Sequence, residues 1–207
     1  MRIDILLFEG FDELDALAPY EYLQRANEFG AGFTVRLVTV SETTEVTAFY
    51  GLRMRPDGVL DSDHPADIIV VPGGGWNHRG TRGVRVEAER GVLPAALAAA
   101  HRSGAILAGV CTGVMLIATA GILRGRPATT HHGAREELQQ LGSTLVAARI
   151  VDDGDVITAA GVTSGLDLAS WITERFASAP VALAVEERLE YERRGTVWQQ
   201  QQAPHAE

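Results

Sequence analysis

The stretch AILAGVCTGVMLIA, residues 105–118, decides the fold, because an apolar run ends in a glycine-bounded turn and a second apolar run follows at once. The turn Gly109-Val110-Cys111-Thr112-Gly113 has the G-x-C-x-G pattern of a nucleophile elbow between a buried strand and a helix. A cysteine there is expected at the carboxyl edge of a sheet and at a helix N-terminus, where N–H groups favour the thiolate. Cys111 is the only cysteine of the chain, and the structural alternative is a small buried core residue.

Short apolar runs rich in β-branched residues recur along the chain, separated by helical periodicity or turn residues. This alternation predicts βαβ units and a mostly parallel sheet covered on both faces, which is a three-layer α/β sandwich. The expected strands are Ile3–Leu7, Val35–Val40, Ile68–Val71, Ile106–Val110 and Val156–Thr158. The expected helices are Leu17–Phe29, Leu93–Arg102, Arg135–Leu141, Leu166–Phe176 and one that follows Cys111.

The composition favours one soluble domain over residues 1–198, with a glutamine-rich tail over residues 199–207 that we expect to be disordered. The net charge is -9, which argues against a nucleic-acid partner because phosphate contacts need clustered cations. All eighteen basic residues are arginine, so Schiff-base chemistry and pyridoxal phosphate attachment are excluded. No run approaches the ~18 apolar residues of a membrane span, and the first strand lacks a leader pattern. We therefore expect a cytoplasmic protein without a membrane partner.

Two loops are expected to meet Cys111, because ligands of open α/β sheets bind beyond the carboxyl ends of the strands. The first follows the first strand and carries Asp12, Glu13 and Asp15. Asp15 lies nearest the expected helix start, so it is either a helix cap or a proton donor whose pKa is raised by burial beside the cysteine. The spacing alone leaves Asp12 and Glu13 open for the acidic role.

The second loop, residues 72–76, reads Pro-Gly-Gly-Gly-Trp and follows the strand Ile68–Val71. It lacks the G-x-G-x-x-G spacing of a dinucleotide site. Gly73 and Gly74 can direct backbone N–H groups at a developing negative charge, or they form a plain tight turn. Trp76 is either a wall of an apolar pocket or a cover for the sheet edge.

Two adjacent histidines, His131 and His132, follow the cysteine by about twenty residues. One of them is a candidate general base for Cys111, and neighbours in a strand point to opposite faces, so at most one reaches the site. One cysteine without a second nearby ligand pair does not indicate a metal, and we expect none.

Together these segments resemble the DJ-1/PfpI superfamily of class-I glutamine-amidotransferase-like proteins. The resemblance extends from Ile3 to about Glu190 and rests on the acidic loop, the Val70–Gly74 turn and the elbow. The segments Ala128–His131 and Ala160–Asp167 complete it. It implies a flavodoxin-like fold, commonly a homodimer, and no cofactor.

Within that superfamily, Asp15 in place of a glutamate and Thr112 in place of a histidine after the cysteine resemble the isonitrile hydratase branch. This branch adds water to an isocyanide, a small-molecule substrate, and gives an N-substituted formamide. The resemblance implies catalytic roles for Cys111, Asp15 and Thr112. The residues placed at the substrate are Gly73, Gly74, Trp76, His131 and Gly161. The alternatives are a glyoxalase- or deglycase-like cysteine enzyme and a ligand- or redox-sensing protein that does not turn over.

Overall fold

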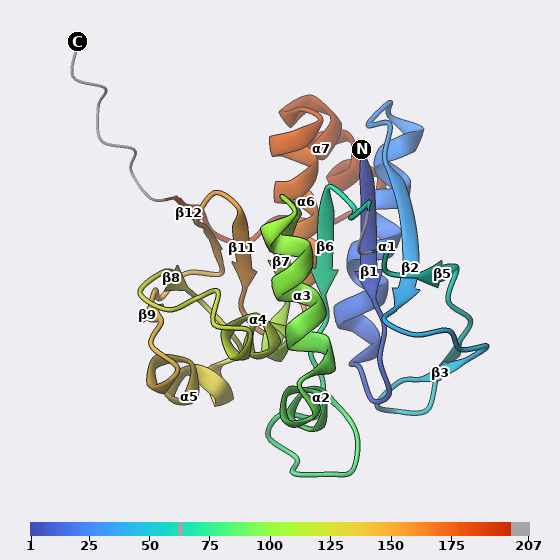
Figure 1. Cartoon of the computed structure of the whole chain (residues 1–207). Helices are drawn as coiled ribbons and strands as arrows, with labels where there is room; N and C mark the ends of the chain where they lie inside the picture. The colour runs from blue at the N-terminus through green and yellow to red at the C-terminus, as the bar shows by residue number, and fades with distance from the viewer. Residues whose placement is uncertain (62–63, 200–207) are drawn as a thin grey trace.

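A computed structural model describes residues 1–61 and 64–199 and is built around one eight-stranded sheet (Figure 1). The strand order is β12-β10-β11-β7-β6-β1-β2-β5. In chain order the strands of this sheet are β1 Arg2–Leu6, β2 Thr34–Thr39, β5 Gly58–Val59, β6 Ile68–Val71, β7 Ile106–Gly109, β10 Ile150–Asp152, β11 Val156–Ala159 and β12 Val197–Gln199.

The sheet is mostly parallel, as the sequence predicts. Neighbouring strands from β5 to β11 pair in parallel, whereas β10 is antiparallel to β11, and β12 runs parallel to β10. All four residues of β6 are buried, which is the requirement for a strand covered on both faces. Two small pairs lie outside this sheet, formed by β3 Val46–Thr47 with β4 Arg53–Met54, and by β8 Pro127–Ala128 with β9 Thr144–Leu145.

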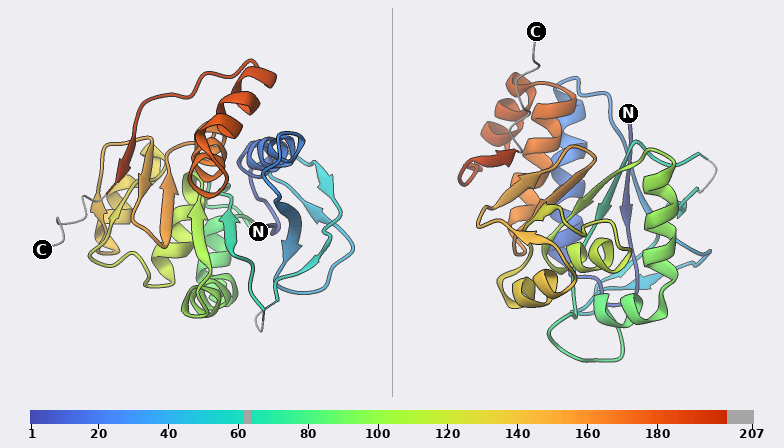
Figure 2. Two further views of the ribbon diagram at one scale, coloured as in Figure 1. Left: turned by 90° about the horizontal axis from the view of Figure 1, so that it is seen from above. Right: turned by 60° about the vertical axis from the view of Figure 1, so that its left-hand side comes forward.

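Helices cover the sheet on both sides and complete the three-layer sandwich (Figure 2). One layer consists of α1 Glu13–Glu28, α6 Ser164–Phe176 and α7 Ala179–Arg188, which pack on one another. The opposite layer consists of α2 Val84–Arg90, α3 Val92–Arg102 and α4 Val114–Thr119. A further helix, α5 Arg135–Gln140, packs beside β9. Within the described ranges, no helix is both long and apolar enough to cross a lipid bilayer.

Several expected boundaries differ from the observed ones by one or two residues, and the first helix differs by four. The first helix begins at Glu13 rather than Leu17, because the Asp12 side chain accepts a hydrogen bond from the Leu14 N–H and caps the helix four residues earlier. The expected disordered tail begins one residue too early, since Gln199 belongs to β12 and pairs with Asp152. Residues 200–207 lie outside the described residues.

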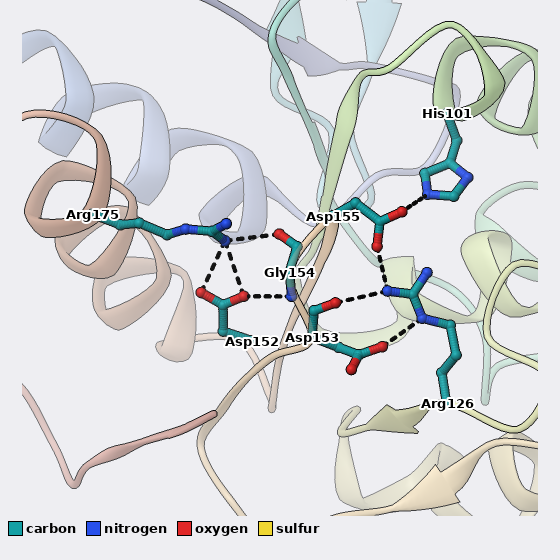
Figure 3. A network of polar contacts seen from close by, with 7 residues as sticks. All are labelled: His101, Arg126, Asp152, Asp153, Gly154, Asp155 and Arg175. Atoms are coloured by element: carbon teal, nitrogen blue, oxygen red, sulfur yellow. Dashed lines mark hydrogen bonds and ion pairs between the residues drawn. The ribbon is translucent and has the colours of Figure 1, made fainter. Parts of the chain in front are cut away.

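A polar network anchors the antiparallel β10–β11 hairpin to the body of the fold (Figure 3). Buried Asp152 accepts hydrogen bonds from Trp171 and Arg175 of α6 at 2.7 and 2.9 Å. On the other side of the hairpin turn, Arg126 pairs with Asp153 and Asp155, and Asp155 also meets His101 of α3 at 2.8 Å. The hairpin turn, with the carboxyl end of β10 and the amino end of β11, is thereby fixed to both helical layers.

Candidate active site

Cys111 lies in the sharp turn that the sequence predicts, between β7 and the single turn of 3₁₀ helix Cys111–Gly113 that leads into α4. Its φ of 56° is in the left-handed region, where a side chain is strained, and such strain concentrates at functional positions. Neither glycine of the motif leaves room for a side chain. A Cβ at Gly113 would overlap the Val71 carbonyl oxygen, and one at Gly109 would lie 2.8 Å from a Val114 methyl group.

The Cys111 thiol is buried, with 6% of the residue exposed. The backbone N–H groups of Thr112 and Val162 donate hydrogen bonds toward it and lower its pKa. Burial and the nearby Asp15 carboxylate outweigh them, so that the pKa of Cys111 is raised from 9.0 to about 12. The N–H groups at the turn thus favour the thiolate as expected, but burial and Asp15 shift the pKa of Cys111 upward overall.

Asp15 is the acidic partner of the cysteine. It is fully buried in the first turn of α1, and its Oδ2 accepts a hydrogen bond of 2.8 Å from the Gly73 N–H. Its Oδ1 is buried without a partner of ordinary geometry, and the Cys111 thiol is the side chain that interacts with this carboxyl. Burial, and then the charge of Asp12, raise the pKa of Asp15 well above 3.8. The two groups therefore titrate as a coupled pair.

The three acidic residues that the spacing cannot distinguish, Asp12, Glu13 and Asp15, have different environments in the structure. Asp12 is the cap of α1. Glu13 turns away, and its Oε1 accepts a hydrogen bond of 2.8 Å from the Tyr50 N–H. Of the three, Asp15 is the one whose side chain hydrogen-bonds with the thiol, whereas Asp12 acts on Cys111 through its charge.

Gly73 and Gly74 shape the site but do not leave N–H groups free for an oxyanion. The Gly73 N–H is bonded to Asp15, and the Gly74 N–H donates to Thr112 Oγ1 at 3.0 Å. A Cβ at Gly73 would lie 2.6 Å from Thr112 Oγ1 and 2.7 Å from Asp15 Oδ2. The oxyanion alternative is thus a poor description of this loop, and its glycines instead hold Asp15 and Thr112 in place.

A small cavity of about 120 Å³ opens above the thiol. This volume is below the ~300–1,000 Å³ of a typical drug-sized ligand site, so the cavity suits a small molecule. Its lining comes from several loops at the carboxyl edge of the sheet: Asp12, Phe49, Tyr50, Gly74, Gly75, Trp76, Asn77, His78, Cys111, Thr112, His131 and Val162.

Trp76 is a wall of this cavity, as one of the two alternatives predicts, and two elements hold its ring. The Arg85 guanidinium of α2 stacks over the indole at 4.1 Å, and the indole N–H donates to Glu137 of α5 at 3.1 Å. Arg85 also donates to both Glu137 oxygens at 2.8 and 2.9 Å, which lowers the pKa of Glu137. We call these three residues the tryptophan clamp.

Of the two histidines, only His131 lines the cavity. The reason differs from the predicted one, because the pair lies at a turn rather than in a strand and its rings pack 4.1 Å apart. His131 Nδ1 accepts a hydrogen bond from the Gly133 N–H, and burial lowers the pKa of His131. Gly161 lies against the His131 ring, where a Cβ would come within 2.8 Å, and its neighbour Val162 faces the cavity instead.

Phe49, Tyr50, Asn77, His78 and Val162 line the cavity but are absent from the predicted set. Val162 carries a recognisable signal, since it follows the carboxyl end of β11 within the Ala160–Asp167 segment. Phe49 and Tyr50 carry none, because they reach the site from a loop that lies far from the motifs in the chain. In residues 1–61 and 64–199, no three His, Cys, Asp or Glu side chains gather as a metal site would require.

The family model and the similar proteins agree on one family for this chain. Residues 1–175 match the model of the DJ-1/PfpI family. An isonitrile hydratase from Pseudomonas putida is 31% identical over 92% of this chain and 78% of its own length. A deglycase from Pyrococcus horikoshii is 27% identical over 84% of this chain and 96% of its own length. The crystal structure of a THiJ/PfpI family protein from Pseudomonas syringae superposes with a TM-score of 0.78, at 26% identity over 94% of this chain and 76% of that one.

Proposed function

The chain belongs to the DJ-1/PfpI family, and from that premise we propose that it is an isonitrile hydratase, which adds water to R–N≡C and yields the formamide R–NH–CHO. One observation carries the proposal: the buried Asp15 carboxyl interacts with the Cys111 thiol, and this thiol lines a cavity for a small molecule. We assign the pair one shared proton. An isonitrile carbon must accept a nucleophile and a proton together, and this pair supplies both.

In the first step the Cys111 sulfur forms a bond to the terminal isonitrile carbon, and the shared proton passes through Asp15 to the same carbon. The product is a thioimidate, R–N=CH–S–Cys111, with Asp15 left as the carboxylate. A covalent intermediate of this kind divides one difficult addition into two easier steps. The raised pKa of Asp15 is suited to this role, because it keeps a carboxylic acid protonated beside the reacting carbon.

In the second step Asp15 accepts a proton from water as the water oxygen attacks the thioimidate carbon, and Asp15 passes this proton to the nitrogen, which leaves R–NH–CH(OH)–S–Cys111 and the Asp15 carboxylate. The tetrahedral adduct collapses to R–NH–CHO, the carbon–sulfur bond breaks, and the hydroxyl proton returns to the Cys111–Asp15 pair. Thr112 Oγ1 accepts from the Gly74 N–H, so its own O–H is free to donate, and we assign it the positioning of the water.

The alternatives use the same cysteine. A deglycase- or glyoxalase-like activity is supported by the similarity to the Pyrococcus horikoshii deglycase. A redox-sensing role is less well supported, because oxidation follows thiolate character and the pKa of Cys111 is raised.

The test is incubation of the reduced protein with cyclohexyl isocyanide, with N-cyclohexylformamide measured by mass spectrometry. We expect turnover by the wild type, none by Cys111→Ala, and a loss of about 10²-fold or more in Asp15→Asn, the usual contribution of a general acid. Methylglyoxal is the parallel substrate. Lactate formation without formamide formation would replace the hydratase assignment with a glyoxalase one.

A further inference from the structure

The cavity above Cys111 is lined, within the described residues, by one acidic side chain and by no lysine or arginine. Asp12 is the acidic residue among the twelve that line it. His131 also lines it, and burial lowers the pKa of that imidazole and so favours its neutral form. A substrate that enters therefore meets negative charge without a lining cation to balance it.

Two of the arginines near the cavity donate to other partners. Arg82 donates to the Phe49 carbonyl at 3.0 Å. Arg85 donates to the Trp76 carbonyl at 2.8 Å and to both oxygens of Glu137. Arg135 acts on the His131 ring and lowers its pKa, but it is not a lining residue.

Asp12 is held on the cavity wall by the start of α1. Its side chain accepts from the Leu14 N–H at 3.1 Å, and its backbone N–H donates to the Gly73 carbonyl at 2.8 Å. Its charge reaches the reacting groups, since Asp12 contributes to the raised pKa of both Asp15 and Cys111. In a half-buried setting such a charge acts more strongly than it would in water.

We propose that this cavity accepts small uncharged substrates and rejects anionic ones, and that Asp12 is the residue that imposes this selection. Given the proposed function, on which this step rests, the substrate class is a neutral isonitrile of small volume. Isonitriles that carry a carboxylate are excluded, although their reactive group is the same.

The first test does not depend on hydratase activity. Iodoacetamide and iodoacetate both alkylate a thiolate, forming a carbon–sulfur bond as the carbon–iodine bond breaks and iodide leaves, and they differ in charge. Because Cys111 is the only cysteine, mass spectrometry reports its modification without ambiguity. The ratio of the two rates, divided by the same ratio for free N-acetylcysteine, measures the selection by charge.

We expect this normalised ratio to favour iodoacetamide by about tenfold or more in the wild type. In Asp12→Asn it should fall to about threefold or less, since asparagine caps a helix as well as aspartate does while the charge is lost. Any change in the pKa of Cys111 affects both reagents and cancels in the ratio. A ratio in Asp12→Asn equal to that of the wild type would overturn the proposal, as would a wild-type ratio near one.

The second test compares turnover of cyclohexyl isocyanide with that of isocyanoacetate. We expect kcat/KM to favour the neutral compound by about tenfold or more, and Asp12→Asn to lower the KM for the anion. Equal kcat/KM for both compounds would overturn the charge selection and leave the hydratase intact. No turnover of either compound, together with the alkylation result expected above, would overturn the hydratase and leave the selection intact.

Discussion

The Asp15 carboxyl and the Cys111 thiol each contribute to the pKa shift of the other. Each is buried, and burial is the largest cause of the raised pKa of each; the Asp15 carboxylate raises the pKa of the thiol further, whereas the hydrogen bond from the thiol lowers the pKa of Asp15. The raised pKa of Cys111 favours the protonated thiol at rest, and under the proposed function the thiol is activated when its proton is delivered to the substrate. In such a site the acid and the nucleophile depend on one another.

Replacing Asp15 with asparagine should separate reactivity from catalysis. The pKa of Cys111 should fall from about 12 toward 9.0, because the carboxylate charge that raises it is removed. Alkylation by iodoacetamide at neutral pH should then become faster, while hydration of cyclohexyl isocyanide is lost. The thiolate absorbance in the ultraviolet, followed against pH with Cys111→Ala as the blank, measures this pKa. A pKa that stays at or above the wild-type value would contradict the coupled pair.

Asp15 also makes stability depend on pH. Its pKa is raised on folding, so the unfolded chain gives up this proton near 3.8 while the folded chain still holds it. The contribution of Asp15 to stability is therefore complete below 3.8 and is lost as pH rises toward the folded pKa. In that window the wild type should lose about 1.4 kcal/mol per pH unit relative to Asp15→Asn, measured by urea unfolding. Parallel stability curves for the two proteins would refute this account.

The two glycines of the elbow should differ in their tolerance of a side chain. In Gly113→Ala the new methyl group meets the Val71 carbonyl oxygen, which is backbone and cannot move aside, so we expect a loss of about 3 kcal/mol or more in unfolding free energy. Gly109→Ala meets the ends of the Val114 and Ile117 side chains, which can shift, and should cost less. Chemical denaturation measures both. An equal cost would show that the closeness of Gly113 to β6 does not limit the turn.

At the scale of elements, the sequence predicts those whose pattern is local. The runs Ile68–Val71 and Ile106–Gly109 are buried on both faces, so continuous apolar residues identify them. The edge strand Val197–Gln199 is three residues long and exists because β10 pairs with it, which local sequence does not reveal. The helix Ala179–Arg188 is absent from the predicted set although its start carries a signal, since Ser178 caps it and Pro180 stands in its first turn.

The candidate site divides in the same way. Cys111 and Asp15 are predictable because each follows a strand at a fixed spacing, and parallel strands bring their carboxyl ends together. The positions of Phe49, Tyr50 and His78 in the cavity are not predictable, because they depend on the way in which extended loops fold over the sheet edge. The hydrogen bonds that the Gly73 and Gly74 N–H groups donate likewise result from packing between loops. The spacing of residues in the sequence does not predict these two bonds.

The tryptophan clamp joins α2 and α5 across one wall of the cavity, and its loss should affect binding more than chemistry. In Arg85→Ala the Trp76 ring loses its stacked guanidinium, and Glu137 loses its ion pair. We expect about 1–2 kcal/mol lower stability and a KM for cyclohexyl isocyanide that rises more than kcat falls. Arg53→Ala is the control, because it also removes one arginine charge but from an exposed side chain that pairs with Glu45 rather than with Trp76 or Glu137. A lower kcat at unchanged KM would place the clamp in the chemical step instead.

At the scale of the whole molecule, the net charge of -9 adds to the effect of Asp12, because an acidic protein repels anions at a distance. The two contributions respond differently to salt, since the Debye length falls from about 30 Å at 0.01 M to about 3 Å at 1 M while a half-buried charge is screened much less. Raising the salt concentration should therefore speed alkylation of Cys111 by iodoacetate more than alkylation by iodoacetamide, yet leave a preference for the neutral reagent.

A matched pair of variants separates the local charge from the global one. Asp12 and Glu28 flank opposite ends of α1, about 24 Å apart for a helix of 16 residues, and removing either charge changes the net charge from -9 to -8. Glu28→Gln should shift the iodoacetate rate only at low salt, whereas Asp12→Asn should shift it at both low and high salt. If both variants respond alike, the selection against anions arises from the net charge of the protein, and the position of Asp12 on the cavity wall has no part in it.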